Sequence, residues 1–146
     1  MKIENDVQIS EAEWEVMRIV WTLKTVHTSD VIKQLQAKKG WSESTIKTLM
    51  RRLEKKGMLL VAKEGHRFTY TAAVDQNEMM YKAIKNSFDQ MCDMHKGDVV
   101  IRLLKDIPLS SKDIDKMIDI LEQKRQTAPE KVSCNCLNDC EAVNGC

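Results

Sequence analysis

The sequence predicts a mainly α-helical protein with one small β-hairpin, and three observations lead to this fold class. Much of the 146-residue chain carries apolar side chains at the i, i+3, i+4 spacing of amphipathic helices. Residues 59–71 instead form two short β-prone runs with a glycine between them, which is typical of a hairpin. Three predicted helices precede that hairpin and further helices follow it.

The first helix is expected to begin after Ser10 and to end near Lys24. Ser10 and Glu13 match a capping box, in which each side chain satisfies a backbone amide that the first turn leaves free. Apolar residues then follow at helical spacing: Trp14, Met17, Val20 and Trp21. Together with Trp41, the two tryptophans are predicted to be the large apolar anchors of one core.

Two more helices are expected before the hairpin. One begins after Thr28 or Ser29 and ends at Gly40, a glycine stop that follows two lysines. The next is capped by Ser42 or Ser44. Its buried stripe is predicted to be Ile46, Leu49, Met50 and Leu53.

The hairpin pairs residues 59–63 with residues 67–71, and Gly65 lies in the turn that separates them. Three helices followed by a hairpin is the element order of a winged helix, a relative of the helix-turn-helix. In such a fold the last of the three helices enters the major groove of DNA. We therefore predict a winged helix-turn-helix DNA-binding domain over residues 1–75.

Residues 76–126 are predicted to form a helical dimerisation region. Apolar residues line one side of a long helix from about Met79, and shorter helices are expected at residues 99–104 and after Ser110. Three helices of this size cannot easily enclose a core by themselves, so we expect a second copy of the chain to cover them. Residues 127–146 then form a polar linker and a cysteine-rich tail.

The net charge of +1 conceals a basic segment. Residues 38–72 hold 9 Lys and Arg against 3 Asp and Glu. Such a patch attracts polyanions, including double-stranded DNA, although Lys and Arg also occur simply as solvated surface residues. The predicted DNA-binding residues belong to the third helix and the hairpin: Ser44, Thr45, Lys47, Thr48, Arg51, Arg52, Lys55, Lys63, His66 and Arg67. The first four are expected to reach base edges or phosphates, and the others to contact the backbone or minor groove.

Four of the five cysteines lie in the last thirteen residues, at Cys134, Cys136, Cys140 and Cys146. Thiolates are soft ligands that select Cu(I), Zn(II) or iron–sulfur clusters. The spacing lacks the runs typical of iron–sulfur proteins, and it fits a four-thiolate Zn(II) site and a small Cu(I) cluster equally well. Cys92 stands apart from the tail and is expected to be a small buried apolar residue.

The composition also excludes some classes of protein. No run of about eighteen apolar residues is present and the N-terminus lacks a signal peptide, so we expect a cytoplasmic protein with no membrane partner. Thiols stay reduced in that compartment, which favours metal binding over disulfides. Phosphate-binding loops and nucleophile–base motifs are absent from the sequence, so no enzymatic activity is expected.

Three strings of residues resemble one known family. ISEAEWEVM at 9–17, WSESTIKTL at 41–49 and LEKKG at 53–57 resemble the penicillinase-repressor family, which includes the BlaI, MecI and CopY repressors. The match is closest over the N-terminal domain and looser beyond it. The resemblance implies a homodimeric winged-helix repressor that binds a palindromic operator through its N-terminal domain and dimerises through its C-terminal helices.

The tail distinguishes the branches of this family. Copper-responsive CopY members end in C-x-C-x4-C-x-C, whereas β-lactam-responsive members lack a cysteine cluster and are inactivated by proteolysis. The present tail resembles the CopY pattern but reads C-x-C-x3-C-x5-C. The resemblance implies release from DNA when Cu(I) displaces Zn(II) at the tail cysteines, with derepression of copper-export genes and a copper chaperone as a further candidate partner. The alternatives are a β-lactam-type repressor and a Cu(I) buffer or chaperone.

Overall fold

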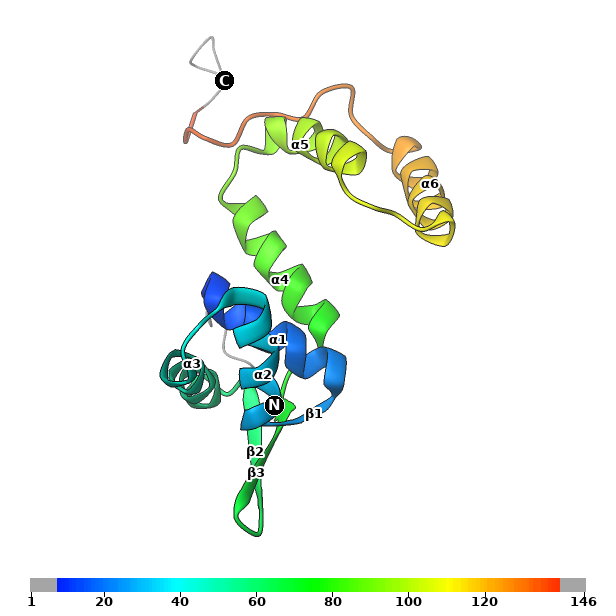
Figure 1. Cartoon of the computed structure of the whole chain (residues 1–146). Coiled ribbons are helices and arrows are strands. Elements are labelled where there is room, and N and C mark those ends of the chain that lie inside the picture. Colours follow the sequence, from blue (N-terminus) through cyan, green and yellow to red (C-terminus); the bar gives the residue numbers. More distant parts are fainter. Residues whose placement is uncertain (1–7, 140–146) are drawn as a thin grey trace. The chain divides into compact units, whose positions relative to one another are not determined.

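The structure is a computed structural model that describes residues 8–139 of the chain (Figure 1). Its elements are α1 (Glu11–Leu23), β1 (Thr25–His27), α2 (Thr28–Lys39), α3 (Glu43–Lys55), β2 (Leu59–Glu64), β3 (Arg67–Ala72), α4 (Gln76–Asp89), α5 (Asp93–Asp106) and α6 (Ser111–Arg125). They fall into two compact units, of which the first ends at Ala83 and the second begins at Ile84, inside α4. The predicted class, mainly helical with a small hairpin, is confirmed.

Local side-chain caps set where the helices of the first unit begin. Ser10 caps α1, because its hydroxyl accepts a hydrogen bond from the Glu13 amide at 3.2 Å. Ser42, one of the two predicted N-caps, caps the start of α3 in the same way. The helix α2 begins one or two residues earlier than predicted, since His27 is its N-cap and donates its amide to the Asp30 carboxylate at 2.8 Å.

The first unit has one hydrophobic core between α1, α2, α3 and the strands. The predicted stripe of α3 is confirmed, because Ile46, Leu49, Met50 and Leu53 are all buried. Trp21 is also buried and donates its indole N–H to the Val74 carbonyl at 3.0 Å. Trp14 and Trp41 are half-buried and pack against this core, so each predicted anchor contacts it.

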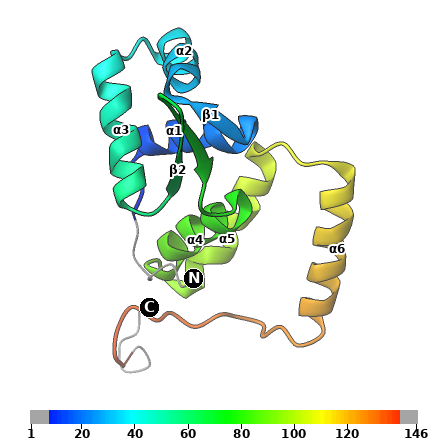
Figure 2. The same cartoon turned by 90° about the horizontal axis from the view of Figure 1, so that it is seen from below.

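The hairpin is part of a three-stranded antiparallel sheet in the order β1-β3-β2 (Figure 2). The strands β2 and β3 were predicted, and Gly65 occupies their two-residue turn with φ +64°, a left-handed conformation that favours glycine. The short strand β1 was missed. It has three residues, too few for a two-residue period, and its pairing with β3 places Val26 opposite Tyr70.

The second unit contains the last part of α4, α5 and α6. The helix α6 begins after Ser110 as predicted, with a serine cap. The helix α5 begins six residues before the predicted start, because its first six residues carry mostly polar side chains and give no apolar period. Neither α5 nor α6 has a buried residue, so these helices enclose no core of their own.

Among the described residues, no helix combines the length and the apolar character that crossing a bilayer requires.

Candidate DNA-binding surface and cysteine cluster

One side of α3 carries a continuous stripe of exposed polar and basic residues. Because the opposite stripe is fixed in the core, the rotation of α3 about its axis is fixed as well. The exposed residues recur at i, i+3, i+4, i+7, i+8 and i+11: Ser44, Lys47, Thr48, Arg51, Arg52 and Lys55. Thr45 flanks this stripe and is also exposed. The structure thus brings the predicted residues of α3 together on one solvent-facing surface.

The hydroxyl groups at the start of this stripe are held by local hydrogen bonds. The Ser42 hydroxyl lies 3.1 Å from the Ser44 hydroxyl and 2.9 Å from that of Thr45. The Thr48 hydroxyl donates to the Ser44 carbonyl at 2.9 Å. The first turn of α3 therefore presents an ordered set of small donors and acceptors, the type of group that contacts base edges and phosphates.

Ion pairs separate the nine cations of residues 38–72 into two groups. Four are paired with glutamates: Lys38, Lys39, Lys47 and Lys56. The side chains of the other five make no ion pair or hydrogen bond with any described residue: Arg51, Arg52, Lys55, Lys63 and Arg67. All five unpaired cations belong to the predicted DNA-binding set, so within residues 38–72 the unpaired positive charge lies on α3 and the hairpin.

Three of the paired lysines, Lys38, Lys39 and Lys56, are tied to α1 by two carboxylates. Glu15 accepts from Lys38 at 2.8 Å, and this hydrogen bond lowers the pKa of the Glu15 carboxyl despite a smaller opposing effect of desolvation. Glu13 accepts from Lys56 at 2.8 Å. Burial by itself would raise the pKa of Glu13, but hydrogen bonds from Lys56 and Ser10 outweigh it, so the pKa is lowered. Both carboxylates are therefore charged at neutral pH and hold their lysines in structural roles.

The tip of the hairpin forms the second part of the basic surface. Lys63, His66 and Arg67 are all exposed around the turn at Gly65. In Figure 1 this hairpin extends away from the three helices that form the core of the first unit. A strand pair that projects in this way can follow a phosphate backbone beside the groove that a helix enters.

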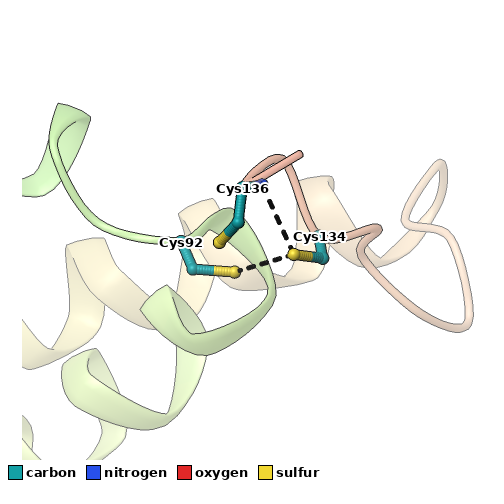
Figure 3. Close-up of side chains that lie close together, drawn as sticks. All are labelled: Cys92, Cys134 and Cys136. Atoms are coloured by element: carbon teal, nitrogen blue, oxygen red, sulfur yellow. Dashed lines mark hydrogen bonds between the residues drawn. The ribbon is translucent and has the colours of Figure 1, made fainter. Parts of the chain in front are cut away.

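Three sulfur atoms converge in the second unit, as Figure 3 shows. They belong to Cys92, Cys134 and Cys136, and all lie within 4.8 Å of one another. The thiol of Cys92 is 3.5 Å from the Cys134 sulfur, and the amide of Cys136 donates to the same sulfur at 3.4 Å. Cys140 and Cys146, the other predicted metal ligands, lie outside the described residues.

The prediction for Cys92 was wrong. It is a partly exposed residue in a sulfur cluster rather than a buried apolar side chain. It is also the N-cap residue of α5, where backbone amides point outward and favour a negative group. The tail docks at the same helix end, since the Asn135 side-chain oxygen accepts from the Asp93 amide at 2.9 Å.

The pKa values of Cys92 and Cys136 are shifted in opposite directions. Hydrogen bonding with the Cys136 thiol, aided by the amides of Met94 and Asn135, lowers the pKa of Cys92. Hydrogen bonds with Cys134 and Cys92 raise the pKa of Cys136 to about 12, because they favour its protonated form. Without a metal, the first proton is therefore lost from Cys92 more readily than from Cys136.

Cys92 could not be placed with the tail from the sequence because it lies 42 positions before Cys134. One signal was present in the sequence. Cys92 directly precedes Asp93, and a polar or thiol group followed by an acidic residue is a pattern of helix N-termini. A cysteine at a helix start, in a chain that already carries a cysteine tail, is a candidate fifth ligand.

Comparison with known proteins assigns the chain to a family. The penicillinase repressor family model matches residues 9–123. An uncharacterized 16.5 kDa protein in the ptsI 3'region of Latilactobacillus sakei is 48% identical over 139 residues, covering 94% of this chain and 95% of that protein. The methicillin resistance regulatory protein MecI of Staphylococcus aureus (strain N315) is 34% identical over 117 residues, covering 80% and 95%. The solution structure of the DNA binding domain of the repressor BlaI is 45% identical, with a TM-score of 0.46, and covers 49% of this chain and 87% of that one. This chain belongs to the penicillinase-repressor family, and it is a transcriptional repressor rather than an enzyme.

Proposed function

We propose that this chain is a copper-responsive repressor that binds operator DNA as a homodimer and is released when Cu(I) replaces Zn(II) at its C-terminal cysteines. Release would derepress copper-export genes. The observation that carries the copper response is the convergence of tail sulfurs in a member of a repressor family. The DNA-binding and metal-binding parts of the proposal rest on separate sets of residues.

The unpaired cations support DNA binding through α3 and the hairpin. In this proposal α3 enters the major groove, where Ser44, Thr45, Lys47 and Thr48 meet base edges or phosphates. The remaining cations of α3 and the hairpin tip neutralise phosphates along the backbone. These five cations lack internal partners, which supports this role, because none of them has to leave an ion pair within the described chain to contact a phosphate.

The sulfur geometry fits a small thiophilic cation. With metal–sulfur bonds of about 2.3 Å, two ligands of one tetrahedral ion are about 3.8 Å apart. The described sulfurs, one pair at 3.5 Å and all within 4.8 Å of one another, are close to this spacing. Binding requires the thiols to give up their protons, so the affinity of the site falls as the pH is lowered. Soft thiolates bind both Zn(II) and Cu(I), and they bind Cu(I) more tightly.

The helices of the second unit support the homodimer. Apolar residues that are at least one-third exposed line α5 and α6: Val99, Val100, Ile101, Leu103, Leu104, Ile114, Ile118, Ile120 and Leu121. An apolar surface of this extent on a monomer marks an interaction site, and a second copy offers the same helices in return. Two-fold pairing would also present two α3 helices to the two halves of a palindromic operator.

Release by copper requires coupling between the metal site and DNA binding. Moving the repressor from mostly bound to mostly free takes a coupling free energy of about 3 to 5 kcal/mol. This coupling has to come from different affinities of the Zn(II) and Cu(I) forms for the operator.

The direct test is a titration of the full-length protein on labelled DNA from the region upstream of its own gene. Under anaerobic conditions the Zn(II)-loaded protein should bind with nanomolar to micromolar affinity, and Cu(I) should release it. A Cys134→Ser/Cys136→Ser variant should bind the DNA but stay bound when Cu(I) is added. If Cu(I) releases this variant as well, the tail is not the copper sensor.

A β-lactam-type repressor is the second candidate, favoured by the similarity to MecI. It would be released by proteolytic cleavage in the helical region and would be indifferent to copper. Reporter expression in cells separates the two candidates: induction by copper supports the first, and induction by a β-lactam with loss of intact repressor supports the second. A Cu(I) buffer or chaperone would give no sequence-specific footprint on DNA.

A further inference from the structure

We propose that Cys92 is a metal ligand, and that it completes a three-sulfur site with Cys134 and Cys136 for a soft cation at the start of α5. This inference deepens the proposed function and rests on it for the identity of the cation, Zn(II) or Cu(I). It differs from a site made by the tail alone, because one ligand comes from the segment between α4 and α5.

The positions of the three sulfurs carry the inference. The Cys92 and Cys134 sulfurs are 3.5 Å apart, and this contact joins the helix start to the tail. Cys136 brings the third sulfur within 4.8 Å of both. One ion at about 2.3 Å from each sulfur is compatible with these separations. Three thiolates alone suit Cu(I), and a fourth donor would complete a tetrahedral Zn(II) site.

The docking of the tail is a second and independent observation. The Asn135 side chain accepts from the Asp93 amide and the Cys136 amide donates to the Cys134 sulfur. These hydrogen bonds hold the Cys-Asn-Cys segment against the end of α5 at which Cys92 lies. Hydrogen bonds from amides to metal-bound sulfur are the kind of outer contact that orients ligands in metal sites.

The electrostatics of the helix end favour thiolate over thiol. Cys92 lies at the N-cap of α5, a helix of 14 residues, where the helix dipole stabilises negative charge. A cation is needed to bring three thiolates together, because like charges at this separation repel one another.

The position of Cys92 gives the metal a route to the DNA-binding unit. Cys92 follows α4 by three residues, and α4 is the helix that leaves the first unit, in whose core Met79 is buried. A cation held by Cys92 and the tail would restrain the junction of α4 and α5. Exchange of one cation for another with a different coordination number would then change that restraint. A site made by tail residues alone would not act on this junction directly.

Differential alkylation tests the assignment on the full chain. Reduced protein is loaded with Zn(II) in one arm and with Cu(I) in the other, treated with N-ethylmaleimide, and mapped by peptide mass spectrometry. Cys92 should react at least about tenfold more slowly in one or both loaded arms than in metal-free protein, and the protected arm identifies the cation. Loading the Cys134→Ser/Cys136→Ser variant should not protect Cys92.

A second measurement separates coordination from simple shielding by the tail. Cys92→Ser should weaken metal affinity by about tenfold or more in a chelator competition, as loss of a ligand does. Serine is a good N-cap, so α5 should be retained, which circular dichroism checks. Met91→Ser, at the exposed neighbouring position, should bind metal as the wild type does.

Two negative results have different meanings. If Cys134 and Cys136 are protected while Cys92 reacts at the metal-free rate, or if Cys92→Ser keeps full affinity, Cys92 is not a ligand and the proposed function stands. If neither Zn(II) nor Cu(I) protects any tail cysteine, both the three-sulfur site and the proposed metal response are wrong.

Discussion

The carboxylate of Glu13 is a buried charge, and its side chain is only 3% exposed. A carboxylate in that position is tolerated because it accepts hydrogen bonds from the Ser10 hydroxyl and the Lys56 ammonium group. Lys56 also donates to the Gln8 carbonyl. This ion pair joins the start of α1 to the residue after α3, so it fixes the helix that carries the DNA-binding stripe.

Removing the lysine should therefore destabilise the first unit. We expect Lys56→Met to lower the free energy of unfolding by about 2 to 3 kcal/mol, because the Glu13 carboxylate stays buried without a partner. Lys39→Met removes a lysine from the more exposed pair with Glu15 and should cost less than about 1 kcal/mol. Urea unfolding followed by circular dichroism measures both.

The same ion pair predicts an acid dependence of stability. The pKa of Glu13 is lowered from its ordinary value of 4.5, so the folded protein holds this proton less tightly than the unfolded chain. The contribution of the pair is fully present above pH 4.5 and should be lost as the pH falls through the lowered pKa. Unfolding at a series of pH values should show this loss in wild type and not in Lys56→Met. Equal acid dependence of the two proteins would assign it to other groups.

Single cations should differ in their effect on DNA according to their internal partners. We expect Arg51→Ala to weaken operator binding and to reduce the slope of log Kd against log salt by about one unit, as loss of one phosphate contact does. Lys39→Ala removes the same charge, but from a residue that is paired with Glu15, and should leave the slope unchanged. Fluorescence anisotropy at several salt concentrations gives the slopes. A similar change in both variants would mean that only net charge matters.

At the scale of the elements, the position of α3 is set by its cap and its buried stripe together. The Ser42 hydroxyl accepts a hydrogen bond from the Thr45 amide at 3.2 Å and contacts the hydroxyls of Ser44 and Thr45. The buried stripe fixes the rotation of the helix, while the cap fixes the residue at which it begins. Both features are needed to place Ser44, Thr45 and Thr48 on one exposed turn.

Loss of this cap should be measurable. We expect Ser42→Ala to cost about 1 kcal/mol in the free energy of unfolding, because the Thr45 amide loses its partner. Ser44→Ala, within the same turn, removes a hydroxyl that does not cap the helix and should cost less than about 0.5 kcal/mol. Denaturant unfolding distinguishes the two, and equal costs would show that the cap does not control the start of α3.

The elements of the first unit could be predicted from the sequence because their signals are local. Ser10 and Ser42 identify two helix starts, the apolar spacing identifies α3, and the glycine at 65 identifies the hairpin turn. The strand β1 could not be predicted in this way, since its three residues become a strand only through pairing with β3. The early start of α5 was missed because its first turns are polar.

At the scale of the whole molecule, the two units differ in how they are stabilised. The first has a continuous core, whereas no residue of α5 or α6 is buried. The apolar periodicity of the second unit predicted helices correctly, yet it could not show what covers them. The cysteine cluster was only half predictable for a similar reason: the tail pattern is local, but the convergence of Cys92 with it depends on the folded chain.

A charge placed on the apolar face of α6 should separate the proposed dimer. Leu121 is 57% exposed in the single chain. In a two-fold dimer, the Leu121 side chains of both copies would be buried. We expect Leu121→Lys to raise the dimer dissociation constant by at least about 100-fold, which follows from burial energies of about 1.5 to 3 kcal/mol per leucine. Glu122→Lys, the next residue along the exposed helix, should stay dimeric. Sedimentation equilibrium measures both, and an unchanged Leu121→Lys dimer would place the interface elsewhere.

The contact between Asn135 and the Asp93 amide has one more consequence, for the timing of local opening. Cys92 occupies the cap position of α5 without a capping hydrogen bond from its side chain, so Asn135, 42 positions after Asp93, supplies the acceptor. Fraying of the first turn of α5 and undocking of the tail are then one event rather than two. Amide hydrogen–deuterium exchange at Asp93 should accelerate when the chain is truncated after Ser133, while exchange in the middle of α5 should be less affected.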